Sequence, residues 1–258
     1  MNVLQNLIEL YDHLSPDSTY RAVVSKILMN LRDAAEANVY ELAELTSSSR
    51  TTIWRMLQML GYEHFSDFHH ALRQAVRQYT YYNRIVPSSR VTEEDVTDEI
   101  IHQLGIAAKK AERDLDSEKL VKMAERIAKS SGLFFFFPYR TAAIKSFQQN
   151  LAMAGIESGV ACLYPDMLAC AKNMQEGSVA LCMTIEYAET QDMTAVFETL
   201  EGKGTYTVIF SGGDSRYDMY AKEQVCKGDQ GSDVLSGVVR YEAYIFALSE
   251  VFRRMVLD

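Results

Sequence analysis

The sequence predicts an α + α/β chain, in which an all-helical N-terminal domain with a helix-turn-helix precedes a doubly wound domain built on a parallel sheet. Two observations predict this class. Residues 39–62, VYELAELTSSSRTTIWRMLQMLGY, have the pattern of two short amphipathic helices joined by a polar turn. Beyond residue 132, short unbroken apolar runs alternate with helical periods, which is typical of buried parallel strands connected by helices.

The N-terminal pattern predicts the buried positions and the ends of the two expected helices. Polar residues 47–49 interrupt the apolar spacing, and Ser48 or Ser49 is suited to cap the second helix because a serine hydroxyl accepts a hydrogen bond from a free amide. Gly61 is expected to end that helix. The expected buried positions are Leu42, Ala43 and Leu45 on the first helix and Ile53, Met56, Leu57 and Leu60 on the second.

The opposite face of the second helix carries polar and aromatic side chains that are able to reach a DNA groove. We expect Arg50 and Gln58 to read base edges, and Arg55 to contact phosphate or brace the helix. Trp54, the single tryptophan, either lies at the DNA surface or packs inside the domain. A plain helical hairpin with a solvated face has the same periodicity. The candidate DNA-binding residues are Ser49, Arg50, Thr51, Trp54, Arg55 and Gln58.

The formal net charge of −9 at pH 7 is unevenly distributed. Residues 1–90 hold nine Lys and Arg against nine Asp and Glu, which leaves seventeen against twenty-six for the remainder. Between residues 50 and 84, five arginines face two acids, which favours phosphate contacts in that segment. For Arg73 and Arg77, a solvated charged face is the alternative.

The helical period lapses at residues 83–89, NRIVPSS, where a proline and two serines follow. We therefore expect a helix-turn-helix domain at 1–82, a linker at 83–91 and an α/β domain at 92–258. The expected strands of the second domain are residues 133–137, 160–164, 179–184 and 206–210. Its expected helices are residues 92–115, 120–128, 141–154, 165–174, 190–202 and 236–257.

Several kinds of chemistry are disfavoured. No stretch approaches the ~20 apolar residues of a membrane span, and no secretory signal is visible, so a cytoplasmic location is expected. The four cysteines show no C-x-x-C spacing and are expected to be buried free thiols. No metal site, cofactor or arrangement of nucleophile, base and acid emerges, and we expect no enzymatic activity.

The N-terminal motif resembles that of the RpiR family of bacterial transcriptional regulators. The family has a Ser-x-x-Thr-(Val/Ile)-x-Arg run, then Leu-Gly-(Tyr/Phe) and a Phe-Ser-x-Phe segment. Leu14-Ser15-Pro16 and a helix over about 19–34 also resemble the family's opening, so the similarity covers residues 1 to about 80. The matching residues are Ser49, Thr52, Ile53, Arg55, Leu60, Gly61, Tyr62, Phe65, Ser66 and Phe68.

The resemblance implies a regulator that binds a double-stranded DNA operator as a homodimer or homotetramer. It also implies a second, sugar isomerase (SIS) domain that usually binds a phosphosugar as effector. Here the chain departs from the family. Pro138 to Thr141 stand where a glycine-rich turn is expected. Of a Ser-x-Ser-Gly-x-Thr run only Thr190 matches, since Ile185 and Tyr187 replace the serines.

These departures predict an SIS-like domain with degenerate phosphate-binding motifs, because small residues let backbone amides approach a phosphate and Glu186 adds an opposing charge. Any effector is expected at the carboxyl ends of the strands, where open α/β sheets bind ligands. The alternative for Arg140 is a surface ion pair, and the alternative for residues 211–213 is a plain turn. The candidate effector-binding residues are Arg140, Thr141, Thr184, Thr190 and Ser211.

The function expected from the resemblance is transcriptional regulation with oligomerisation, and metabolite sensing, by the second domain. The alternative is an SIS-type sugar-phosphate isomerase with an accessory helical domain. A third hypothesis is an interaction protein in which the SIS-like fold survives as an oligomerisation platform.

Overall fold

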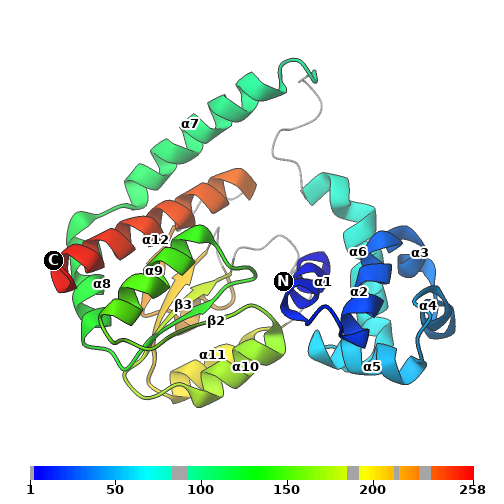
Figure 1. Cartoon of the computed structure of the whole chain (residues 1–258). Helices are drawn as coiled ribbons and strands as arrows, with labels where there is room; N and C mark the ends of the chain where they lie inside the picture. Colours follow the sequence, from blue (N-terminus) through cyan, green and yellow to red (C-terminus); the bar gives the residue numbers. More distant parts are fainter. Residues whose placement is uncertain (1–2, 83–91, 185–191, 212–214, 227–233) are drawn as a thin grey trace.

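The computed structural model describes residues 3–82, 92–184, 192–211, 215–226 and 234–258. A helical region spans residues 3–82, and an α/β region follows it (Figure 1). The helical region comprises α1 (Val3–His13), α2 (Thr19–Met29), α3 (Leu31–Glu36), α4 (Val39–Leu45), α5 (Arg50–Met59) and α6 (Phe65–Tyr82).

The α/β region contains five parallel strands in the order β2-β1-β3-β4-β5. The strands are β1 (Leu133–Phe136), β2 (Ser158–Ala161), β3 (Val179–Met183), β4 (Tyr206–Phe210) and β5 (Glu223–Val225). The other elements are α7 (Val96–Asp114), α8 (Ser117–Ala128), α9 (Ala142–Met153), α10 (Tyr164–Asn173), α11 (Thr194–Gly202), η1 (Asp218–Tyr220) and α12 (Val234–Val256). The predicted α + α/β class with a doubly wound parallel sheet is confirmed.

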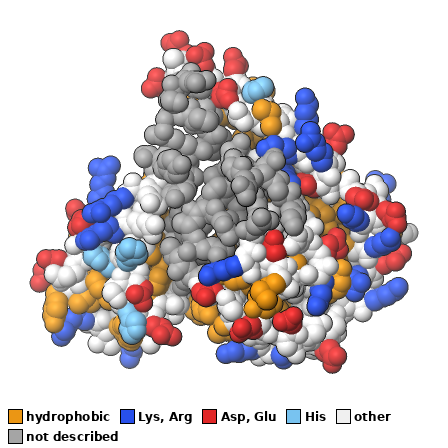
Figure 2. All heavy atoms as spheres, turned by 180° about the vertical axis from the view of Figure 1, so that it is seen from behind, with side chains coloured by type: hydrophobic (Ala, Val, Ile, Leu, Met, Phe, Trp, Pro, Cys, Tyr) orange, Lys and Arg blue, Asp and Glu red, His pale blue; other side chains and the backbone are white. Residues whose placement is uncertain are grey.

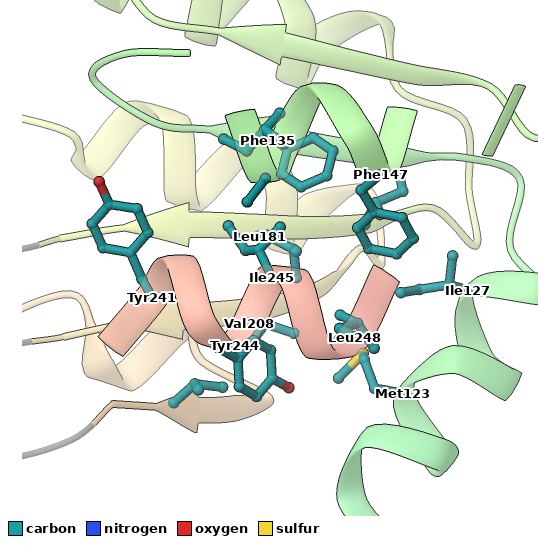
Figure 3. Close-up of a cluster of buried hydrophobic side chains, with 14 of the residues drawn as sticks. Met123, Ile127, Phe135, Phe147, Leu181, Val208, Tyr241, Tyr244, Ile245 and Leu248 are labelled. Atoms are coloured by element: carbon teal, nitrogen blue, oxygen red, sulfur yellow. The ribbon is translucent and has the colours of Figure 1, made fainter. Parts of the chain in front are cut away.

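Both faces of the sheet are covered, which explains the unbroken apolar runs. Successive residues of β1 point to opposite sides: Phe135 packs in the cluster with α8, α9 and α12, whereas Phe136 packs in the cluster with α10 and α11. Leu181 and Val208 point toward α12, where Ile245 meets them (Figure 3). The apolar positions therefore follow from the pleat of a strand that is buried on both sides.

The strand order reverses between β1 and β3, since the chain moves from β1 out to β2 and then back across β1 to β3. In open α/β sheets, a crevice forms at the carboxyl ends of the strands at this point. We call the carboxyl ends of the five strands, with the residues that directly follow them, the sheet edge.

Several expected boundaries were wrong. The helix expected over 19–34 divides at Asn30, whose backbone leaves the helical conformation with φ −132°. β2 ends at Ala161 because Pro165 opens α10 and Leu163 leaves the sheet to join the core of the helical region. The sequence patterns also gave no indication of α1, β5 or η1.

The helical region has its own core, in which the apolar faces of α1, α2, α5 and α6 meet. Leu163, which follows β2, belongs to the same cluster, so the two regions are in contact. Residues 83–91, the expected linker, lie outside the described residues. Within the described parts of the chain, no helix is both long and apolar enough to span a membrane.

Candidate functional site

A tight turn joins α4 to α5, and local hydrogen bonds fix it. Ser47 adopts a left-handed conformation with φ 50° at the end of α4. The Ser48 amide donates to the Ala43 carbonyl at 2.8 Å, and the Ser47 amide donates to the Glu44 carbonyl at 2.9 Å. This pair of bonds satisfies the last carbonyls of α4 and sets the direction in which the chain enters α5.

Helix α5 is capped at both ends as its sequence predicts. Ser49, of the two candidate serines, is the N-cap, and its hydroxyl accepts from the Thr52 amide at 3.1 Å. Ser48 instead hydrogen-bonds the hydroxyl of Thr46. At the other end Gly61 has φ 83°, and the Tyr62 amide donates to the Leu57 carbonyl at 2.9 Å.

The two faces of α5 differ sharply in exposure. The side chains of Ile53, Met56, Leu57 and Leu60 are fully buried, as predicted. Trp54 is 41% exposed, which excludes its packing inside the isolated region. We call the opposite side of the helix the α5 face. Its members are Ser49, Arg50, Thr51, Trp54, Arg55 and Gln58, all of them exposed.

Tyr40 contributes a contact to the α5 face that the sequence patterns did not indicate. The guanidinium of Arg50 lies 4.6 Å from the centre of the Tyr40 ring, and its Nη1 donates to the Tyr40 hydroxyl at 3.1 Å. Tyr40 is itself exposed, on the first turn of α4. The stacking holds the arginine at the N-terminal end of α5, and the residue remains exposed.

Arg73 and Arg77 of α6 have a partner within the helical region. Nη2 of Arg73 lies 2.8 Å from the Glu36 carboxylate, and Nη2 of Arg77 lies 3.3 Å from the same carboxylate. Arg73 also donates to the carbonyl of Ala35. These contacts tie α6 to α3, which favours a structural role for both arginines. Figure 2 shows basic and histidine side chains on the helical region, at the left of that view.

At the sheet edge, the structure places the described effector candidates against other parts of the protein, and the hydroxyl of Ser211 is buried with no hydrogen-bond partner among the described residues. Arg140 forms an ion pair with Glu9 of α1. Thr184 is buried, and its amide donates to the Phe210 carbonyl at 3.0 Å. Ser211 is buried, and its amide donates to the carbonyl of Val225. Thr184 and Ser211 are thus enclosed, and the assignment of these residues to an effector stays a prediction.

Thr141 caps α9, the helix that follows β1. Its hydroxyl oxygen accepts from the Ile144 amide at 3.3 Å. The carboxylate of Glu242, on α12, accepts hydrogen bonds from the Thr141 hydroxyl and the Ala143 amide. Burial raises the pKa of Glu242 above its ordinary value, and these two hydrogen bonds oppose that rise. An acidic side chain therefore already occupies the helix start at which a phosphate would accept the same hydrogen bonds.

Asp192 occupies the start of α11, the helix that follows β3, in the same way. Its Oδ1 accepts from the Thr194 amide at 2.9 Å and the Thr194 hydroxyl at 2.6 Å. These hydrogen bonds, assisted by Arg216, lower the pKa of Asp192. Thr190, Ile185, Glu186 and Tyr187, which the sequence comparison singled out, lie outside the described residues. Sequence patterns missed Glu242 and Asp192 because neither lies in the expected phosphate-binding motifs.

The four cysteines carry no disulfide, and three of them are buried. Burial raises the pKa of Cys170 to about 11 and that of Cys162 to about 12. Within the described ranges, no group of three or more His, Cys, Asp or Glu side chains is arranged to hold a metal ion.

No family model and no curated protein matches the chain. Among solved structures, it is similar to the NanR protein of Vibrio vulnificus complexed with ManNAc-6P, with 17% identity and a TM-score of 0.42 over 99% of this chain and 91% of that chain. It is also similar to the sugar isomerase domain of an RpiR transcription factor from Sphaerobacter thermophilus, with 13% identity and a TM-score of 0.44 over 63% of this chain and 98% of that chain.

A third similar structure is a putative sugar-phosphate isomerase from Listeria monocytogenes, with 15% identity and a TM-score of 0.46 over 65% of this chain and 91% of that chain. The similar structures thus include a domain of a transcription factor and a putative enzyme. At such low identities and TM-scores, they assign neither a family nor an activity to this chain.

Proposed function

We propose that the chain is a DNA-binding transcriptional regulator of the RpiR type, in which α4 and α5 form a helix-turn-helix and α5 enters the major groove. The observation that carries this proposal is the α5 face. Its polar and aromatic side chains are exposed, while the other side of the same helix is anchored in the core. Such a helix presents side chains to base edges at a fixed angle.

Three further features support the proposal. The family motif and the turn hydrogen bonds coincide, since Ser49 caps α5 and Gly61 ends it. Arg55 and Gln58 are exposed along the helix, and Arg50 stands at its first turn. The acidic excess of the chain lies outside residues 1–90, which leaves this region electrically balanced. In this proposal residues 1–82 bind DNA, 83–91 link, and 92–258 oligomerise.

Oligomerisation is proposed because paired DNA-binding regions recognise paired half-sites. Exposed apolar side chains on α7 and α12 support it: Ile101, Leu104 and Phe246 are all exposed, on two helices that pack against each other. Light scattering is expected to show a dimer or tetramer, and Phe246→Glu or Ile101→Glu to shift it toward monomer. Met153→Glu, at an exposed position on α9, serves as the matched control.

The α/β region is proposed to bind phosphosugars weakly or not at all at the starts of the helices that follow its strands. Carboxylates from Glu242 and Asp192 hold the starts of the two helices that follow β1 and β3. A phosphate at either start would meet that negative charge. This arrangement favours a regulator or platform over the alternative isomerase.

The test is selection of bound duplexes from a random DNA library by the full chain, followed by titration of the selected site. The fluorescence of Trp54 reports binding, because the indole lies on the α5 face. We expect a change in intensity or wavelength on the selected site and a weaker change on a scrambled one. Failure to enrich any sequence, or an unchanged Trp54 signal at saturation, would contradict the proposal.

A further inference from the structure

Helix α1 links the helical region to the sheet edge through one acidic side chain. Its apolar residues, including Leu7 and Leu10, pack in the core of the helical region. Glu9 points elsewhere and forms an ion pair with Arg140, which stands between β1 and α9. The Glu9 side chain is 14% exposed, so this carboxylate is largely enclosed at the contact between the two regions.

The same carboxylate meets a second group at the sheet edge. Cys162 directly follows β2 and is 2% exposed. Burial is the largest cause that raises the pKa of its thiol to about 12, and the charge of Glu9 and a hydrogen bond with Glu9 add to the rise. The next residue, Leu163, lies in the core of the helical region. Helix α1 therefore contacts residues that follow β1 and β2, and Figure 1 shows it between the sheet and the rest of the helical region.

This placement has a consequence for ligand binding. The carboxyl end of β1 adjoins the point where the strand order reverses, which is the ligand position of open α/β sheets. Arg140 is the cation that follows β1, and its charge is already matched by Glu9. A ligand anion that takes the place of Glu9 on Arg140 displaces the Glu9 carboxylate, and a largely enclosed carboxylate without its partner is unfavourable.

We propose that Glu9 and Arg140 form a latch that holds the helical region against the sheet edge, and that the carboxylate of a small ligand opens it by replacing Glu9 on Arg140. The latch rests on the proposed regulator function. In that function, it is the contact through which a ligand changes the placement of the DNA-binding region. A carboxylate is favoured over a phosphate because Glu242, bonded to the neighbouring Thr141 and Ala143, opposes a doubly charged group.

Cys162 provides the test, since its thiol is covered when the latch is closed. Full-length protein without DNA is treated with iodoacetamide, and alkylation of each cysteine is followed by peptide mass spectrometry. Glu9→Gln and Arg140→Gln are each expected to accelerate the alkylation of Cys162 roughly tenfold, because the closed state loses an ion pair whose carboxylate is largely enclosed. Cys182, buried beneath α10 and α11, reports any general unfolding.

The two variants separate opening from a local charge effect. Removing the negative charge of Glu9 lowers the pKa of Cys162 and speeds alkylation even in a closed state. Removing the positive charge of Arg140 raises that pKa and slows it, because Arg140 lowers the pKa of the thiol. The latch predicts faster alkylation of Cys162 in both variants. In the double variant with the charges exchanged, Glu9→Arg with Arg140→Glu, it predicts that Cys162 is protected again. Slower alkylation in Arg140→Gln, or no recovery in the exchanged pair, would overturn the latch.

The ligand is tested with acetate, a singly charged carboxylate, against sodium chloride at matched ionic strength. Acetate is expected to accelerate the alkylation of Cys162 in the wild type but to add nothing in Arg140→Gln. Equal rates in acetate and chloride, or a larger effect of inorganic phosphate, would overturn the carboxylate assignment. Glu118→Gln, which removes an exposed ion pair of α8 with Lys122, is the control variant and should behave as wild type. Because no DNA is present, failure here leaves the DNA-binding proposal to its own experiment.

Discussion

The α5 face and the sheet edge present their polar side chains in opposite states. On the α5 face, Thr51, Trp54, Arg55 and Gln58 are exposed around a helix whose other side is fully buried. At the sheet edge, Arg140 is paired with Glu9, and Thr184 and Ser211 are enclosed. The comparison teaches that position at the end of a strand or helix does not by itself make a binding site; side chains such as Thr184 and Ser211 must also be exposed.

Both surfaces lie on well-formed elements, and they differ in where along the chain their contacts come from. The α5 face is built from one helix and its cap, so its partners are nearby in the chain. The sheet edge is met by side chains from α1, α12 and the segment before α11. Substitutions at each surface test whether the two differ as their contacts indicate.

The largest effect is expected from breaking the support of the α5 face. Leu57 is fully buried, so Leu57→Ala should destabilise the helical region by about 2 to 5 kcal/mol through lost burial and a residual cavity. Denaturant unfolding followed by Trp54 fluorescence measures this change. Leu181→Ala, an equally buried change in β3, is the matched control for the α/β region. An unchanged Trp54 transition in Leu57→Ala would show that α5 is not anchored as described.

The next effect concerns the internal anions of the sheet edge. Wild-type protein is expected to bind a common hexose phosphate weakly, and Glu242→Gln to bind it at least about tenfold more tightly, because a carboxylate near a phosphate opposes it by a few kcal/mol at an intermediate dielectric. Calorimetry gives both affinities. If the wild type binds the hexose phosphate with micromolar affinity and Thr190→Ala abolishes that binding, the phosphosugar site works. The proposal that Glu242 and Asp192 occupy the place of the phosphate would then be wrong.

A smaller effect is expected at the turn between α4 and α5. Ser47 has φ 50°, a conformation that costs a residue with a side chain roughly 1 kcal/mol and costs glycine little. Ser47→Gly should therefore raise the stability of the helical region by up to about that amount, measured by the same Trp54 transition. Ser48→Gly, which removes a hydroxyl bonded to Thr46, is the control and should not stabilise. Destabilisation by Ser47→Gly would mean that the turn differs from the one described.

The smallest effect is a pH dependence at Glu242. Its pKa is raised in the folded protein, so between 4.5 and the raised value the folded state holds a proton that the unfolded state has lost. Stability conferred by the protonated form is therefore lost as the pH rises through this window. Glu242→Gln removes this pH-dependent contribution to stability. The melting temperature of the variant minus that of the wild type should therefore increase from pH 4.5 to neutral pH. A constant difference would show that the pKa of Glu242 is not raised.

Sequence reasoning predicted the elements more fully than the sites. The buried stripe of α5, its caps and the strands at 179–183 and 206–210 follow from periodicity and local hydrogen bonding. β2 was placed two residues too late, because the apolar residues after it serve a second core. The partners of Arg140 and Thr141 lie 131 and 101 positions away, and no local pattern brings Glu9 or Glu242 to them.

The most direct test of the central claim is a quantitative binding assay of Arg50→Ala on the selected DNA site and on scrambled DNA. Loss of a base contact should cost about 1 to 3 kcal/mol on the selected site and reduce the preference for it. Arg77→Ala, whose guanidinium pairs with Glu36, is the matched control and should retain both affinity and preference. Unchanged affinity and sequence preference in Arg50→Ala would contradict the assignment of the α5 face as the surface that reads DNA.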